Sequence, residues 1–147
     1  MRQLIRFVIS IVSATAAGIG GEACAEVPDM PPARMHEIAS HIFTGKIARI
    51  YSSVDRSTPG WETTHGVAEF RILRVEKGKH ESALAYVRFW NKRFTGTGAA
   101  PPGAYGHRGV PKVGVAARVY VVTAEDGGLD VLPPNGLAAL SAVEAQK

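Results

Sequence analysis

The sequence has almost no cysteine: Cys24 is the single one in 147 residues. It lies within the first 25 residues, which read as a secretion signal. After removal of that segment the protein would hold no disulfide, no thiolate nucleophile and no cysteine-based zinc site. We therefore expect its stability to come from a hydrophobic core, and we predict neither a metal nor a cofactor.

The sequence also lacks an apolar run of the roughly 20 residues that a membrane-spanning helix needs. Residues 7–17 form a shorter apolar run, with two arginines before it and small residues after it. This order predicts a secretory signal over residues 1–25, cleaved after Ala25. A lipoprotein cut before Cys24 is the alternative, which the charged Glu22 disfavours. We expect a periplasmic or extracellular protein without a transmembrane anchor.

Neither sign of charge is in large excess, since 17 basic and 13 acidic residues give a net charge of +4. So small a charge does not imply a polyanionic partner, and export also argues against nucleic acid. The basic residues are concentrated in residues 71–93, where seven basic groups face two acidic ones. With 46% apolar and 20% charged residues, the composition excludes disorder and coiled coil.

Alternation of apolar and polar residues predicts five short strands, over residues 42–50, 66–75, 83–90, 115–123 and 129–132. Phase changes within the first two predict β-bulges, at Gly45 or Ala48 and near Leu73. Pro31 and Pro32 open a short helix that ends near Ser40. A spacing of three between Leu137, Leu140 and Val143 predicts a short C-terminal helix.

The segments between the strands are predicted as loops. Residues 52–65 are polar and contain a Pro-Gly pair, and residues 94–114 form a long loop rich in glycine and proline. Five strands with bulges favour a mainly β fold, a small five-stranded OB-type barrel, over an open β-sandwich. We expect an extended lead-in over residues 26–34 and a single barrel domain over residues 35–147.

Three segments resemble bacterial secreted members of the netrin/TIMP-like (NTR-like) OB-fold superfamily. They are residues 42–47 (IFTGKI), residues 68–78 (AEFRILRVEKG), and Val113-Gly114 leading to residues 119–122 (VYVV). The resemblance spans about residues 35–133, and their order and spacing carry it. It implies a secreted OB barrel and no defined activity.

Two departures limit what this resemblance transfers. TIMP-like inhibitors chelate the zinc of a protease through an N-terminal cysteine, whereas the predicted mature chain begins with Glu26. Many relatives also pin the barrel with disulfides, which this chain cannot form. We therefore do not expect the inhibitor mechanism.

The outer side of the strand over residues 83–90 is the candidate binding surface. If Ala83, Ala85, Val87 and Phe89 face the core, the alternate residues face outward. Basic side chains between aromatic rings suit oligomeric ligands, because rings stack on bases or sugars while charges follow an anionic backbone. The predicted binding residues are Arg71, Tyr86, Arg88, Trp90, Lys92 and Arg93. In the alternative, Tyr86 and Trp90 belong to the core.

Catalytic and metal sites are weaker candidates. A Ser-His-Asp set can be drawn from Ser57, His65 and Asp126, but no nucleophile elbow supports it. A copper site can be drawn from two methionines and two histidines, Met30, Met35, His36 and His41. Ordinary core methionines and surface histidines explain the same residues.

The sequence therefore predicts an exported, non-enzymatic binding module. Its expected ligand is a protein partner or an anionic envelope glycan, bound by the basic and aromatic face. A secreted hydrolase or a copper-binding periplasmic accessory protein is the alternative. The oligomeric state is left open.

Overall fold

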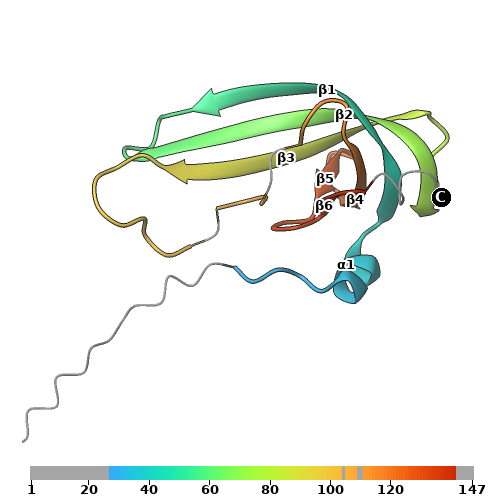
Figure 1. The fold of residues 1–147 in the computed structure, drawn as a ribbon, viewed down its shortest axis with the longest axis horizontal. Helices are drawn as coiled ribbons and strands as arrows, with labels where there is room; N and C mark the ends of the chain where they lie inside the picture. Colours follow the sequence, from blue (N-terminus) through green and yellow to red (C-terminus); the bar gives the residue numbers. More distant parts are fainter. Residues whose placement is uncertain (1–26, 104, 109–110, 142–147) are drawn as a thin grey trace, which may run out of the picture.

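The computed structural model describes residues 27–103, 105–108 and 111–141 (Figure 1). The expected signal segment lies outside the described residues. One helix and six strands follow along the chain: α1 (Pro32–Ile38), β1 (His41–Asp55), β2 (Trp61–Lys77), β3 (Leu84–Phe94), β4 (Ala116–Thr123), β5 (Leu129–Val131) and β6 (Leu137–Ala139). The predicted N-terminal helix is confirmed, with Pro32 at its first position.

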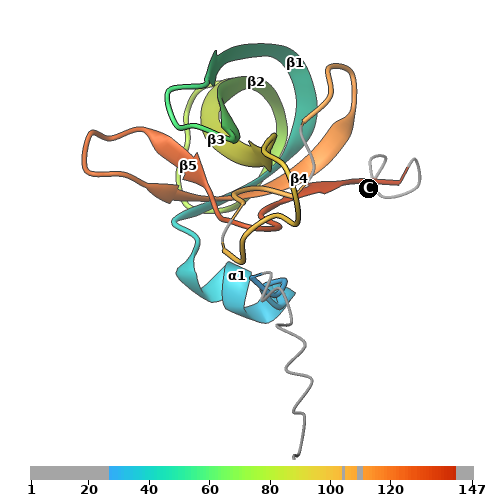
Figure 2. The same cartoon turned by 90° about the vertical axis from the view of Figure 1, so that its left-hand side faces the viewer.

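Five of these strands close into a barrel. Hydrogen bonding runs in the order β1-β2-β3-β5-β4, and antiparallel pairing of β1 with β4 completes the circle. The β3–β5 contact is the parallel one, with only two register pairs. Viewed along the barrel, β1, β2 and β3 curl around its interior (Figure 2). The predicted mainly β, five-stranded OB-type barrel is confirmed.

The first three strands are longer than predicted and continue beyond the barrel. The expected loop over residues 52–65 is wrong, since β1 runs to Asp55 and β2 begins at Trp61. Residues 52–55, 61–66 and 89–94 thus form a projecting sheet (Figure 1). Neither face of this sheet is fully covered, so its sequence lacks the apolar alternation by which strands are recognised.

Both predicted bulges are present. The register between β1 and β2 shifts between Ile47 and Arg49, so that Ala48 is an extra residue in β1. It shifts again opposite Thr44 and Gly45, where Leu73 is the extra residue in β2. A side chain at Gly45 would place its Cβ 2.2 Å from the backbone oxygen of Arg71. Glycine therefore allows β1 and β2 to coil closely.

The barrel interior holds the main hydrophobic core. It is built from inward residues of every barrel strand, including Phe43, Phe70, Val87, Val119 and Val131. A second apolar cluster lies outside the barrel, where α1 covers outward residues of β1 and β4. Its buried members are Met35, Ala39, Ile42, Tyr120 and Leu132. The helix thus covers one side of the barrel and leaves the β2–β3 side open.

The predicted C-terminal helix is wrong over Leu137 to Ala139, which form β6; residues 142–147 lie outside the described part. Leu137 pairs with Val119 and Ala139 with Ala117 of β4. An available strand edge satisfies the backbone of so short a segment, whereas an isolated helix of this length is marginal. Part of the expected 94–114 loop is also paired, since the Lys92 N–H donates to the Tyr105 carbonyl at 2.8 Å.

Candidate binding groove

The alternation predicted for β3 is confirmed for its central residues. Ala85, Val87 and Phe89 are buried, whereas Tyr86 is 53% exposed and Trp90 is partly buried. Ala83 precedes the strand and is exposed, so its expected place in the core is wrong. The predicted outer face therefore exists, and the interpretation of Tyr86 and Trp90 as core residues is not supported.

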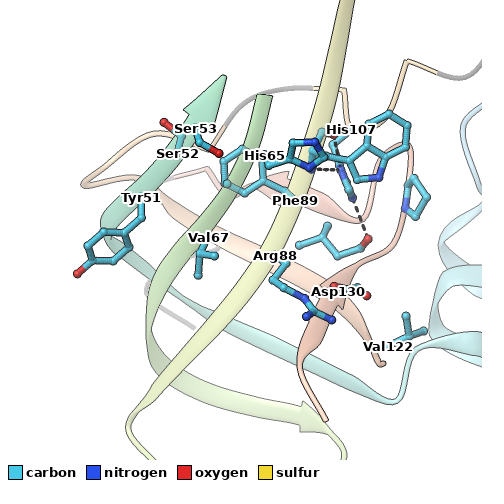
Figure 3. Close-up of a pocket in the computed structure, with 14 residues that line it drawn as sticks. Tyr51, Ser52, Ser53, His65, Val67, Arg88, Phe89, His107, Val122 and Asp130 are labelled. Atoms are coloured by element: carbon cyan, nitrogen blue, oxygen red, sulfur yellow. Dashed lines mark hydrogen bonds and ion pairs between the residues drawn. The ribbon is translucent and has the colours of Figure 1, made fainter. Parts of the chain in front are cut away.

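A groove of about 760 Å³ lies on this outer face (Figure 3). Two rows of outward side chains line it. The first crosses three strands and holds Ser53, His65 and Trp90. The second crosses all five barrel strands and holds Tyr51, Val67, Arg88, Asp130 and Val122. Aromatic rings thus lie at separate places in the groove, with polar groups between them.

Arg88 is the centre of a small ionic network in the groove. Its Nη1 lies 2.5 Å from Asp126 Oδ2, and its Nε lies 2.5 Å from Asp130 Oδ1. The hydrogen bonds that Arg88 donates to Asp126 and then to Asp130 raise the pKa of the guanidinium above its ordinary value. The bonds from Arg88 and the Gly128 N–H lower the pKa of Asp126. Two negative charges against one positive charge remove the cationic character expected of Arg88.

Trp90 is held in place by His107. The backbone N–H of His107 donates to the Trp90 carbonyl at 2.8 Å, and the backbone nitrogen of Trp90 lies 3.0 Å from His107 Nδ1. The other ring nitrogen, Nε2, lies 2.8 Å from the Val131 carbonyl, which can only accept. Nδ1 also lies 2.7 Å from the Trp90 carbonyl, so each ring nitrogen faces a carbonyl to which it can donate. The imidazole bridges β3 and β5 where their short parallel ladder ends, and its ring meets the Trp90 indole edge-on.

The other predicted basic residues do not gather at the groove. The Lys92 ammonium lies 4.5 Å from the centre of the Trp61 ring. Arg93 alternates to the opposite face and pairs with Glu62 at 2.9 Å. Arg71 is the register partner of Lys46, and both line a separate cavity of about 350 Å³. Of the predicted set, the groove thus brings together only Arg88 and Trp90.

The residues weighed for catalysis are not assembled into a triad. The Ser57 hydroxyl donates to Asp55 at 3.1 Å, and Asp126 is held by Arg88. His65 lines the groove beside Ser53, its register partner. This arrangement gives no support to the hydrolase alternative.

The candidate copper ligands do not converge on one site: some already have other partners, and others lie on different sides of α1. Met35 is buried in the cluster under α1, while His36 is exposed on the helix. Both ring nitrogens of His41 have partners, with the Ser40 hydroxyl at 3.0 Å and the Lys79 carbonyl at 3.2 Å. In the described ranges, no three or more His, Cys, Asp or Glu side chains group as metal ligands. No helix among them is long and apolar enough to span a membrane.

Several groove residues were not predicted from the sequence. Tyr51 and Ser53 lie at the end of β1, where the polar composition led to the prediction of a loop. Asp130 carried no signal of its own, because its partner Arg88 is 42 positions earlier. His107 lies in a glycine-rich segment, and the only signal in the sequence was the presence of one histidine among small residues.

Comparisons with models of protein families, with curated proteins and with solved structures found no match for this chain.

Proposed function

We propose that this protein is an exported binding module that holds an extended, uncharged stretch of glycan in the groove. The single observation that carries the proposal is the alignment of the two side-chain rows across the open β2–β3 side. Trp90 and Tyr51 offer ring faces, while His65, Ser53 and Asp130 offer hydrogen-bonding groups. Rings that pack on sugar faces, with polar groups around them, suit a carbohydrate chain.

The electrostatics of the groove favour uncharged sugars over the anionic glycan suggested by the sequence. Arg88 is neutralised by Asp126 and Asp130, and neither Lys92 nor Arg93 lines the groove. An anionic chain would meet the surplus carboxylate charge of this network. Uncharged hydroxyls can instead donate to the free lone pairs of the carboxylates.

The fold supports the proposal in a second way. In OB-type barrels, the face of strands 2 and 3 and the neighbouring loops commonly bind oligomeric ligands. Here the groove occupies that face, and Asp126 brings the β4–β5 turn to its edge. This is fold-level analogy. Export and membership of the NTR-like superfamily belong to the same proposal, on the strength of the N-terminal sequence and the barrel.

The experiment compares two matched tyrosines. Tyr51 is 50% exposed and lines the groove, whereas Tyr86 is 53% exposed and is not among the lining residues. Titration of the protein with uncharged hexasaccharides of different linkage, followed by tryptophan fluorescence, should give saturable binding for at least one of them. Tyr51→Ala should weaken that binding by about tenfold or more, and Tyr86→Ala should leave it unchanged.

A heparin-derived hexasaccharide serves as the anionic probe. Tighter binding of this probe than of every uncharged sugar would contradict the proposed ligand class. Equal loss of binding in both tyrosine variants would contradict the proposed place. Circular dichroism of each variant confirms that the barrel is folded before the titration is interpreted.

A further inference from the structure

The projecting part of β1 has one edge without a partner strand. Along residues 49–55, β2 pairs with one edge through register partners from Glu69 to Thr63. On the other edge β4 pairs only as far as Lys46, and Ile47 makes the last bonds, to Gly114 and Val115. Beyond that point, no described residue pairs with this edge. Its N–H and C=O groups are therefore offered to an additional strand.

The sequence of this edge is complementary to itself. If two copies pair antiparallel about a two-fold axis through Ser52, residue numbers at paired positions sum to 104. Arg49 then lies opposite Asp55 of the second copy, and Ile50 lies opposite Val54. Each of these pairs occurs twice. Opposite charges and apolar pairs directly across antiparallel strands are favourable, so this register matches both faces of the sheet.

The exposed surface is consistent with such pairing. Val54 is 46% exposed, whereas Ile50, four positions earlier on the same strand, packs against the barrel core. Pairing would cover Val54 with Ile50 of the second copy and so extend an existing apolar cluster. The Asp55 carboxylate accepts from the Ser57 N–H at 2.8 Å and from its hydroxyl. A carboxylate has further lone pairs, so Asp55 can also accept from a guanidinium.

We propose that a second copy of this chain pairs with the free edge of β1, in the register centred on Ser52. The two projecting sheets then form one continuous six-stranded sheet across a two-fold axis. Tyr51 and Ser53 of the groove stand beside this axis, so the grooves of the two copies meet there. This inference rests on the strand edge alone and does not depend on the ligand of the groove.

The register is tested by disulfide cross-linking in the full chain with Cys24→Ser. In the proposed dimer the two Ser52 residues face each other directly, within the separation that a disulfide spans. Ser52→Cys should therefore give a covalent dimer under mild oxidation. Ser53→Cys is the matched control: it is also exposed on the same strand, but each Ser53 lies one position from the axis, so the two copies are offset from each other by two positions. It should remain largely monomeric.

Mass by analytical ultracentrifugation tests the dimer without a cross-link. The unmodified chain should change from monomer to dimer as its concentration rises, and the dimer should weaken as salt screens the end pairs. Val54→Lys should raise the dissociation constant about tenfold or more, because it sets two ammonium groups in the apolar pairs. A monomer at every concentration, or cross-linking by Ser53→Cys in preference to Ser52→Cys, would overturn the proposal. Neither readout involves a glycan, so failure of the groove ligand is seen separately.

Discussion

One outer side of the barrel is buried and another is exposed, although the same alternation of residues along the strands produces both. On the β1–β4 side the outward residues are Ile42 and Tyr120, and α1 buries them together with Leu132. On the β2–β3 side the outward residues include Val67 and Arg88, and no element covers them among the described residues. A strand period therefore identifies an outward residue, but only its chemistry and its neighbours decide whether it is covered or available.

The largest expected contrast comes from truncating one aliphatic residue on each side. Ile42 is 1% exposed beneath α1, so Ile42→Ala should destabilise the protein by about 2–5 kcal/mol through a lost contact and a cavity. Val67 is only partly buried in the groove, so Val67→Ala should cost about 1 kcal/mol or less. Chemical denaturation measures both. Equal losses would show that the two sides do not differ as described.

A smaller effect is expected at the groove end, where His107 joins β3 and β5. His107→Ala removes the ring nitrogen beside the backbone N–H and C=O of Trp90 and the ring nitrogen beside the Val131 carbonyl. Leaving these groups without partners should cost about 1–3 kcal/mol in unfolding free energy. The indole loses its neighbour too, so quenching of Trp90 fluorescence should increase. An unchanged unfolding free energy would mean that the imidazole does not bridge the strands.

The smallest effect should appear at the rim of the covered side, in the pH dependence contributed by Glu76. Burial alone would raise its pKa, but hydrogen bonds from Thr44, Arg74 and Arg118 lower it below the ordinary 4.5. Because the folded-state pKa is depressed, the stabilisation is present above pH 4.5 and is lost as pH falls through the lower folded value. The unfolding free energy of Glu76→Gln should therefore decrease less steeply below that pH than the unfolding free energy of the unmodified protein.

The barrel could be predicted because its interior imposes a strict pattern. Phe43, Phe70 and Val87 each stand in an alternating run, and the phase changes near Ala48 and Leu73 mark real bulges. The projecting sheet escaped prediction for the opposite reason: Ser52 to Asp55 pack against no core, so nothing in their composition separates a strand from a loop. The C-terminal spacing misled because three residues of β6 are too few to show a period.

The candidate site was predicted only in part. Alternation placed Tyr86, Arg88 and Trp90 outward, since it needs only local sequence. It did not show that Arg88 is neutralised, because Asp126 and Asp130 arrive from a turn and a strand far along the chain. The formal charge counted along residues 71–93 therefore overstated the positive potential of the face. The two aspartates, which are distant in sequence, are the reason that the geometry favours an uncharged ligand.

The short parallel ladder between β3 and β5 makes this seam of the barrel much weaker than the long β1–β2 and β2–β3 ladders. Two register pairs, the Arg88–Asp130 ion pair and the ring of His107 are what hold it. Backbone amides along this seam should exchange with solvent before those of the long β1–β2 ladder, through partial opening of the barrel. The groove crosses the same seam, so a bound glycan would contact both strands and slow that exchange.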